Sequence, residues 1–150
     1  MKPLIVLLAV FTIAAFALRL IDGHFELAFA ARIAMAVMLL FTASGHFAFT
    51  KGMAMMIPAP VPFKTPLVYL TGIFEIMAAF GLLIHSYQQV SGYALIVFFV
   101  IMLPANIYAA INHIDYQKGT TSGPGVSYLW FRVPLQALFI AWVYVSAILY

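Results

Sequence analysis

One acidic side chain, Glu75, lies in the middle of an apolar stretch that runs from Pro66 to Ile84. No other Asp, Glu, Lys or Arg occurs between Thr65 and Gln89. The stretch is long enough to cross a bilayer. A carboxylate at membrane depth costs free energy, so it marks a partnered structural pair or a functional site. Such a carboxyl group can also act as a general acid or base, and we predict Glu75 as the catalytic residue.

Other strongly polar side chains are predicted at a similar depth. An α-helix rises about 1.5 Å per residue, which places five side chains roughly 6–14 Å from the inner ends of their helices. A sixth, His113, falls at the inner end of its helix. The five are His46, Glu75, Asn106, Arg132 and Gln136.

Helical spacing indicates that these side chains converge. Arg132 and Gln136 are four residues apart, and Asn106 and His113 are seven apart, so each pair shares a helix face. Around Glu75 the aligned positions are small, which allows close helix approach. Pro104 and Pro134 each free a backbone carbonyl one turn earlier, that of Val100 and that of Trp130, near the same band. The sequence therefore predicts a ligand-binding pocket, open toward the inner side, lined by His46, Asn106, His113, Arg132 and Gln136 around Glu75.

Each member of this set has a structural alternative. Glu75 and Arg132 could form a buried salt bridge that only fixes helix register. His46 could be an interfacial histidine, and Asn106 and Gln136 could be interhelical contacts worth about 0.6 kcal/mol each. Two lesser alternatives are a b-type haem between the histidines at 46 and 113, and metal ligation by the methionines at 53, 55 and 56. We predict no metal site.

Five apolar segments can position these residues, each near the length of about 20 residues that a spanning helix needs. Between the second and third, prolines at positions 58, 60 and 62 disfavour helix, and we expect residues 51–65 to lie in the interface or dip into the bundle. Residues 117–125 are expected to form an aqueous loop. The prediction is an all-α polytopic membrane bundle in one domain, a four-helix core plus an N-terminal helix, with spans 3–21, 28–50, 66–85, 90–113 and 127–149.

The composition supports this class. Hydrophobic residues make up 66% of the 150 and charged residues 7%, against about 25% charged in a soluble domain. The net charge of +3 is scattered rather than clustered, which argues against nucleic-acid binding. Cysteine is absent from the sequence, so disulfides, iron–sulfur clusters and c-type haem are excluded. The first segment could be a cleavable signal peptide or a retained helix. The loop bias of Lys and Arg predicts a cytoplasmic N-terminus, with positions 2, 51, 64 and 118 inside.

Six short blocks in order along the chain carry a resemblance. The blocks are Ser-Gly-His-Phe at 44–47, Met-Ile-Pro at 56–58, Val-Tyr-Leu-Thr-Gly-Ile-Phe-Glu at 68–75, Gly-Leu-Leu at 81–83, Leu-Pro-Ala-Asn-Ile-Tyr-Ala-Ala at 103–110 and Arg-Val-Pro-Leu-Gln at 132–136. They resemble bacterial DoxX-family membrane proteins, in the DoxX-like branch. The similarity covers roughly residues 30–146, and segment 3–21 departs from the family's four-helix core. The resemblance implies quinone-coupled sulfur oxidation, as in a thiosulfate:quinone oxidoreductase, or membrane complexes of oxidative-stress defence.

The function expected from the residues and the resemblance is a redox-associated accessory subunit that binds a quinone or another lipophile. Its expected partners are the lipid bilayer, subunits of a membrane redox complex and a second copy of the chain, and its expected location is the bacterial inner membrane. One alternative is a non-catalytic assembly or stabilising partner. A carrier for a small solute is less consistent with the sequence, because no inverted repeat is visible.

Overall fold

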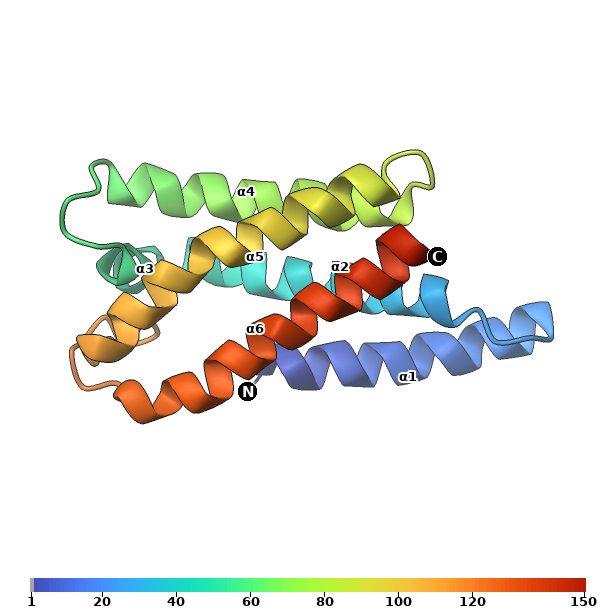
Figure 1. Ribbon diagram of the computed structural model, residues 1–150, viewed down its shortest axis with the longest axis horizontal. Helices are drawn as coiled ribbons and strands as arrows, with labels where there is room; N and C mark the ends of the chain where they lie inside the picture. The colour runs from blue at the N-terminus through green and yellow to red at the C-terminus, as the bar shows by residue number, and fades with distance from the viewer. Residues whose placement is uncertain (1) are drawn as a thin grey trace.

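The computed structural model describes residues 2–150, apart from the side chain of residue 22, and this part of the chain is helical with no strand. Long helices run alternately up and down the molecule and are joined by short connections at its two ends (Figure 1). The elements are α1 (Lys2–Asp22), α2 (Leu27–Ala48), α3 (Thr50–Met56), α4 (Lys64–Leu83), α5 (Gln88–Ile111), the 3₁₀ turn η1 (Val126–Tyr128), α6 (Leu129–Val143) and the π-helical end η2 (Tyr144–Leu149).

Five of these helical segments are long and apolar enough to cross a membrane, which confirms the predicted fold class. Each segment has both ends within two residues of the limits expected from the sequence. A helix satisfies its backbone hydrogen bonds internally, and this is why apolar runs of this length take that form in lipid. Pro104 and Pro134 lie inside α5 and α6, and both helices continue through them.

The core forms where small side chains let α2 and α4 approach each other. Ala34 and Ala36 of α2 are buried, as are Ala78 and Ala79 of α4. Small residues at a helix interface bring the backbones close and increase van der Waals contact. Larger side chains from all the spanning helices fill the rest of this core, including Leu7, Met35, Met38, Leu39, Leu82, Leu95 and Val143.

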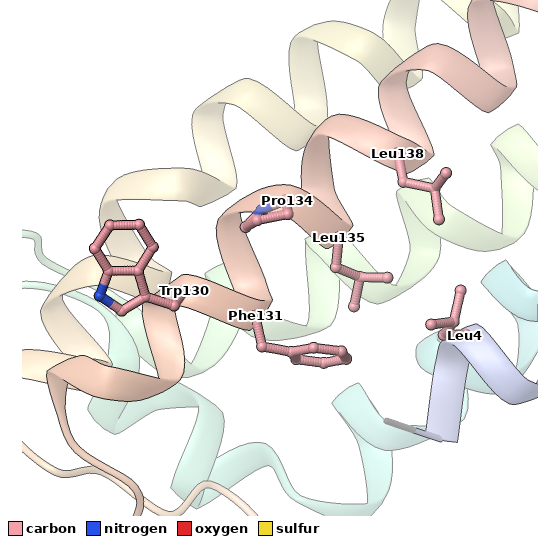
Figure 2. Close-up of a pocket in the computed structure, with 6 residues that line it drawn as sticks. All are labelled: Leu4, Trp130, Phe131, Pro134, Leu135 and Leu138. Atoms are coloured by element: carbon pink, nitrogen blue, oxygen red, sulfur yellow. The ribbon is translucent and has the colours of Figure 1, made fainter.

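The first helix packs against the outside of the α2–α6 side of the bundle. The ring of Phe11 meets the edge of Trp142 with centroids 5.1 Å apart, and Trp142 Nε1 donates a hydrogen bond to the Ala31 carbonyl at 3.0 Å. The N-terminus of α1 lies beside the length of α6 rather than at the end where α6 begins (Figure 1). This offset leaves an apolar hollow of about 230 Å³ between Leu4 and the first half of α6 (Figure 2).

The segment between α2 and α4 differs in part from the expectation. Its methionine-rich first half forms the short helix α3, because the prolines act only on the residues beside them and the chain breaks at Ile57. Gly52 of α3 lies directly against the backbone of Tyr116, since a Cβ at this glycine would be 1.8 Å from the Tyr116 carbonyl oxygen. The helix α3 is therefore docked against the loop that follows α5.

Candidate functional site

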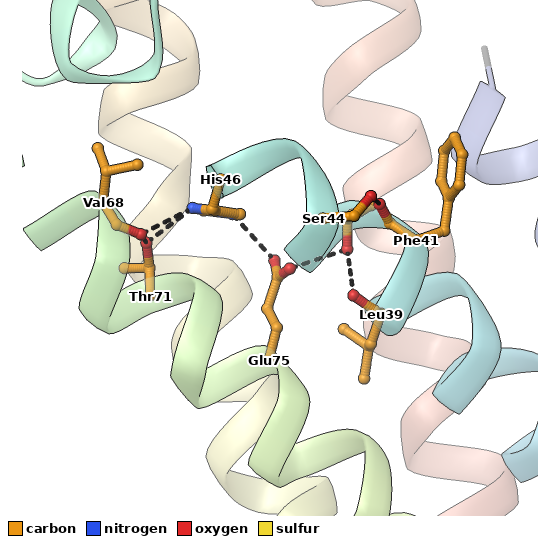
Figure 3. Close-up of polar contacts among 8 residues, drawn as sticks. Leu39, Phe41, Ser44, His46, Val68, Thr71 and Glu75 are labelled. Atoms are coloured by element: carbon orange, nitrogen blue, oxygen red, sulfur yellow. Dashed lines mark hydrogen bonds and ion pairs between the residues drawn. The ribbon is translucent and has the colours of Figure 1, made fainter. Parts of the chain in front are cut away.

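Glu75 lies between α4 and α2, where its carboxylate meets a histidine and a threonine. The residue is only 6% exposed. Its Oε1 is 3.5 Å from His46 Nε2, and its Oε2 accepts a hydrogen bond from Thr42 Oγ1 at 2.9 Å. Helical side chains point back toward the helix N-terminus, which directs the carboxylate toward the end of α2 that carries His46 (Figure 3).

The second ring nitrogen of His46 is held by α4 itself. Nδ1 lies 3.1 Å from the Val68 carbonyl oxygen and 3.0 Å from Thr71 Oγ1. The Thr71 hydroxyl also donates to the Val68 carbonyl at 2.8 Å. Both nitrogens of the imidazole therefore have oxygen partners on α4, and the ring bridges the two helices (Figure 3).

Gly72 makes this approach of the helices possible. A Cβ at position 72 would be 2.9 Å from the Cβ of His46 and 3.3 Å from Cε2 of Phe47. Any side chain there would push α2 away from α4. Gly72 is thus the position that sets how closely His46 and Glu75 meet.

A second polar pair lies between α5 and α6. Asn106 Nδ2 donates to Gln136 Oε1 at 3.0 Å, and Gln136 Nε2 donates to the Phe99 carbonyl oxygen. The acceptor is one residue before Val100, the carbonyl that Pro104 was expected to free. Because both the oxygen and the nitrogen of the Gln136 side-chain amide have partners inside the bundle, this pair holds α5 and α6 together.

The expected pair of Glu75 and Arg132 does not form, and the six predicted site residues do not line one pocket. Arg132, half-buried in α6, has no ion pair or hydrogen bond to any residue that the structure describes. The physical reason is the helix arrangement: α4 packs on α2 and α5, whereas α6 packs on α5. His113 follows α5 with a positive φ of 52°, and its exposed ring lies against Gly125.

The convergence predicted from the sequence is thus divided between two helix interfaces. His46 and Glu75 meet at one, and Asn106 and Gln136 meet at the other. Thr42 and Thr71 were not assigned to the site from the sequence, although they bond to Glu75 and His46. Their spacing was the available signal, since Thr42 is four residues before His46 and Thr71 is four before Glu75.

A further contact that the sequence reasoning missed lies at the opposite end of the bundle. Arg32 of α2 donates to Gln88 Oε1 at the start of α5, and its guanidinium lies 5.6 Å from the centre of the Phe29 ring. Gln88 is buried. Alternating spans place the start of α2 and the start of α5 at the same end, which was the signal for this pair.

The pair of Glu75 and His46 is the arrangement here that can do chemistry, because each group can gain or lose a proton. The apolar hollow between Leu4 and α6 does not include Glu75 or His46 (Figure 2). A fixed cation such as arginine could only hold the carboxylate ionised, whereas a histidine can exchange a proton with it.

Residues 35–147 match the family model described as Domain of unknown function (DUF8561), and the chain belongs to this family. The matched range contains the whole of the Glu75 and Gln136 interfaces and leaves out α1 and the first residues of α2. No curated protein and no solved structure matches the chain.

Proposed function

We propose that this protein is an accessory subunit of a membrane redox assembly, and that its Glu75–His46 pair exchanges a proton with a quinone or a similar lipophilic ligand. The observation that carries the proposal is a buried carboxylate opposed by an imidazole, 3.5 Å from Oε1 to Nε2, inside a helix long enough to span a bilayer. Intramembrane ionisable groups are costly and mark functional sites by default. The blocks that resemble DoxX-family proteins support the redox association, and we place the chain in the bacterial inner membrane with a cytoplasmic N-terminus.

The chemistry follows from what quinone reduction needs. Conversion of a quinone to a quinol takes two electrons and two protons. A reduced flavin or haem of a partner subunit would supply the electrons, and the Glu75–His46 pair would supply the protons one at a time. His46 is the more exposed member, with 13% of its side chain accessible against 8% for Glu75. The imidazole edge is therefore the point of contact with the ligand, and Glu75 is the group behind it.

The full-length protein purified in mild detergent tests the proposal. Its organic extract is analysed for quinone by mass spectrometry, and decylubiquinone is then titrated while the fluorescence of Trp130 and Trp142 is followed. We expect Glu75→Gln to weaken binding at least tenfold. The matched control is Glu26→Gln, because Glu26 also faces a histidine, at 3.2 Å, but on the exposed connection between α1 and α2. A protein that binds no quinone, or a Glu75→Gln variant that binds it as wild type does, would refute the proposal.

The alternative of a non-catalytic stabilising partner is favoured by one observation. Each polar atom of the Glu75 carboxylate and the His46 ring already has a partner within the bundle. In that case Glu75→Gln lowers the thermal unfolding temperature and changes nothing else in the parent complex. The turnover of that complex distinguishes the two functions. Only the proton-exchange function predicts that Glu75→Gln lowers the turnover.

A further inference from the structure

The contacts of the His46 ring favour a hydrogen on Nδ1. A carbonyl oxygen can only accept a hydrogen bond. Nδ1 lies 3.1 Å from the Val68 carbonyl, so a hydrogen on Nδ1 is donated there, whereas a bare Nδ1 would place two lone pairs against each other. The Thr71 hydroxyl uses its own hydrogen on the same carbonyl at 2.8 Å, and so its oxygen can accept from Nδ1 as well. Groups on α4 thus favour this tautomer, in the way that outer-shell partners orient a functional histidine.

With Nδ1 protonated, the gap between Nε2 and Glu75 must hold one further proton. An unprotonated Nε2 facing an ionised carboxylate would place two lone pairs 3.5 Å apart in a buried site. A hydrogen on Nε2 gives an imidazolium–carboxylate pair, and a hydrogen on Glu75 gives a neutral pair. Both forms have the same total charge of zero. The proton can therefore move between the two groups without adding charge to the membrane interior.

The Thr42 hydroxyl can form a hydrogen bond with Glu75 in both protonation states of the pair. Its hydroxyl lies 2.9 Å from Glu75 Oε2 and 3.0 Å from the Leu39 carbonyl oxygen. When Glu75 is ionised, the hydroxyl donates to the carboxylate. When Oε2 carries the proton, it donates to Thr42, whose hydroxyl then turns to the Leu39 carbonyl. Neither state leaves a buried polar atom unsatisfied, which would otherwise cost about 1–3 kcal/mol.

We infer that His46, Glu75 and Thr42 form a one-proton exchange site that opens to one side of the membrane only, with Val68 and Thr71 as positioning groups. Its open side is the partly exposed edge of His46 near the end of α2. On the far side the chain of hydroxyl and carboxyl groups ends at Thr42, and the next buried side chains on α2 and α4 are apolar, namely Leu39, Ala78, Ala79 and Leu82. The inference rests on the proposed function only for the identity of the ligand that takes the proton.

Nitrogen-15 NMR of the full-length protein in nanodiscs, labelled at histidine and without added quinone, tests the inference. A His46→Asn variant assigns the His46 signals among the four histidines. We expect Nδ1 to carry a hydrogen and Nε2 to share a proton with Glu75. Glu75→Gln should remove that shared proton and leave Nδ1 protonated. A His46 with an unprotonated Nδ1, or an Nε2 signal that Glu75→Gln does not change, would overturn the inference.

Thr42→Val and Thr71→Val separate the two threonines. Thr42→Val removes the hydroxyl that donates to Oε2 of the ionised carboxylate, so the Nε2 signal should shift toward the unprotonated form, and Thr42→Ser should restore it. Thr71→Val should keep Nδ1 protonated, because the Val68 carbonyl remains. Thr12→Val is the matched control, since the Thr12 hydroxyl bonds only to the Leu8 carbonyl in α1. A Nε2 signal unchanged in Thr42→Val, or proton flux into protein-containing vesicles above that of empty vesicles, would contradict the site as described. Normal His46 signals with no quinone binding would reject the proposed ligand alone.

Discussion

Replacing Gly72 with alanine tests the close contact on which the His46–Glu75 pair depends. The added Cβ would lie 2.9 Å from the His46 Cβ, whereas ordinary contacts begin at 3.4 Å. The difference of these distances is 0.5 Å, and the His46 Cβ is fixed to the α2 backbone, so the helices themselves must separate. Overpacking of this kind costs about 1–3 kcal/mol. Alanine also stabilises a helix by about 0.5–1 kcal/mol relative to glycine, which offsets part of that cost.

The expected net loss is about 0.5–2 kcal/mol of unfolding free energy, or a few degrees in the unfolding temperature at about 2–4 °C per kcal/mol. Circular dichroism in detergent measures this loss of stability. The NMR signal of His46 Nε2 should also shift, because the substitution lengthens its distance to Glu75 Oε1 beyond the 3.5 Å of the wild type. Gly45→Ala is the control on the neighbouring helix. Its Cβ would lie 3.3 Å from the flexible Met53 Cε and at an ordinary contact distance of 3.9 Å from Phe49 Cδ2, so stability should be unchanged or higher. A Gly72→Ala protein as stable as wild type, with an unshifted His46 signal, would refute the geometry.

Three other substitutions test the rest of the bundle. Gly52→Ala should release α3 from the loop after α5, since its Cβ would be 1.8 Å from the Tyr116 carbonyl; faster proteolysis of that loop measures this, and protection equal to wild type would contradict it. Gln136→Leu should lower stability by about 2–4 kcal/mol, through the loss of two hydrogen bonds worth about 0.6 kcal/mol each and about 1–3 kcal/mol for the unsatisfied Asn106 amide that remains. Arg132→Ala should leave the unfolding temperature within about 1 °C of wild type, because the guanidinium has no ion pair in the described chain. A loss of stability as large as that of Gln136→Leu would contradict this and favour the salt bridge between Arg132 and Glu75.

The local features were readable from the sequence because each depends on chain properties alone. Apolar length predicts the spanning helices, and one carboxylate in such a run predicts a buried polar site around Glu75. The four-residue spacing of Thr42 and His46 places them on one face of α2 without any knowledge of its neighbours. The helix limits were accordingly predicted to within two residues.

Only the tertiary structure decided which of these polar side chains meet. Depth in the membrane is a one-dimensional quantity, and the sequence predicts a similar depth for His46, Asn106, Arg132, Gln136 and Glu75. Neighbourhood in a bundle depends on which helix packs against which, and this is set by the small residues between α2 and α4, above all Gly72. Glu75 therefore meets His46 rather than Arg132, because van der Waals packing of the helix backbones places α4 against α2, whereas α6 packs on α5.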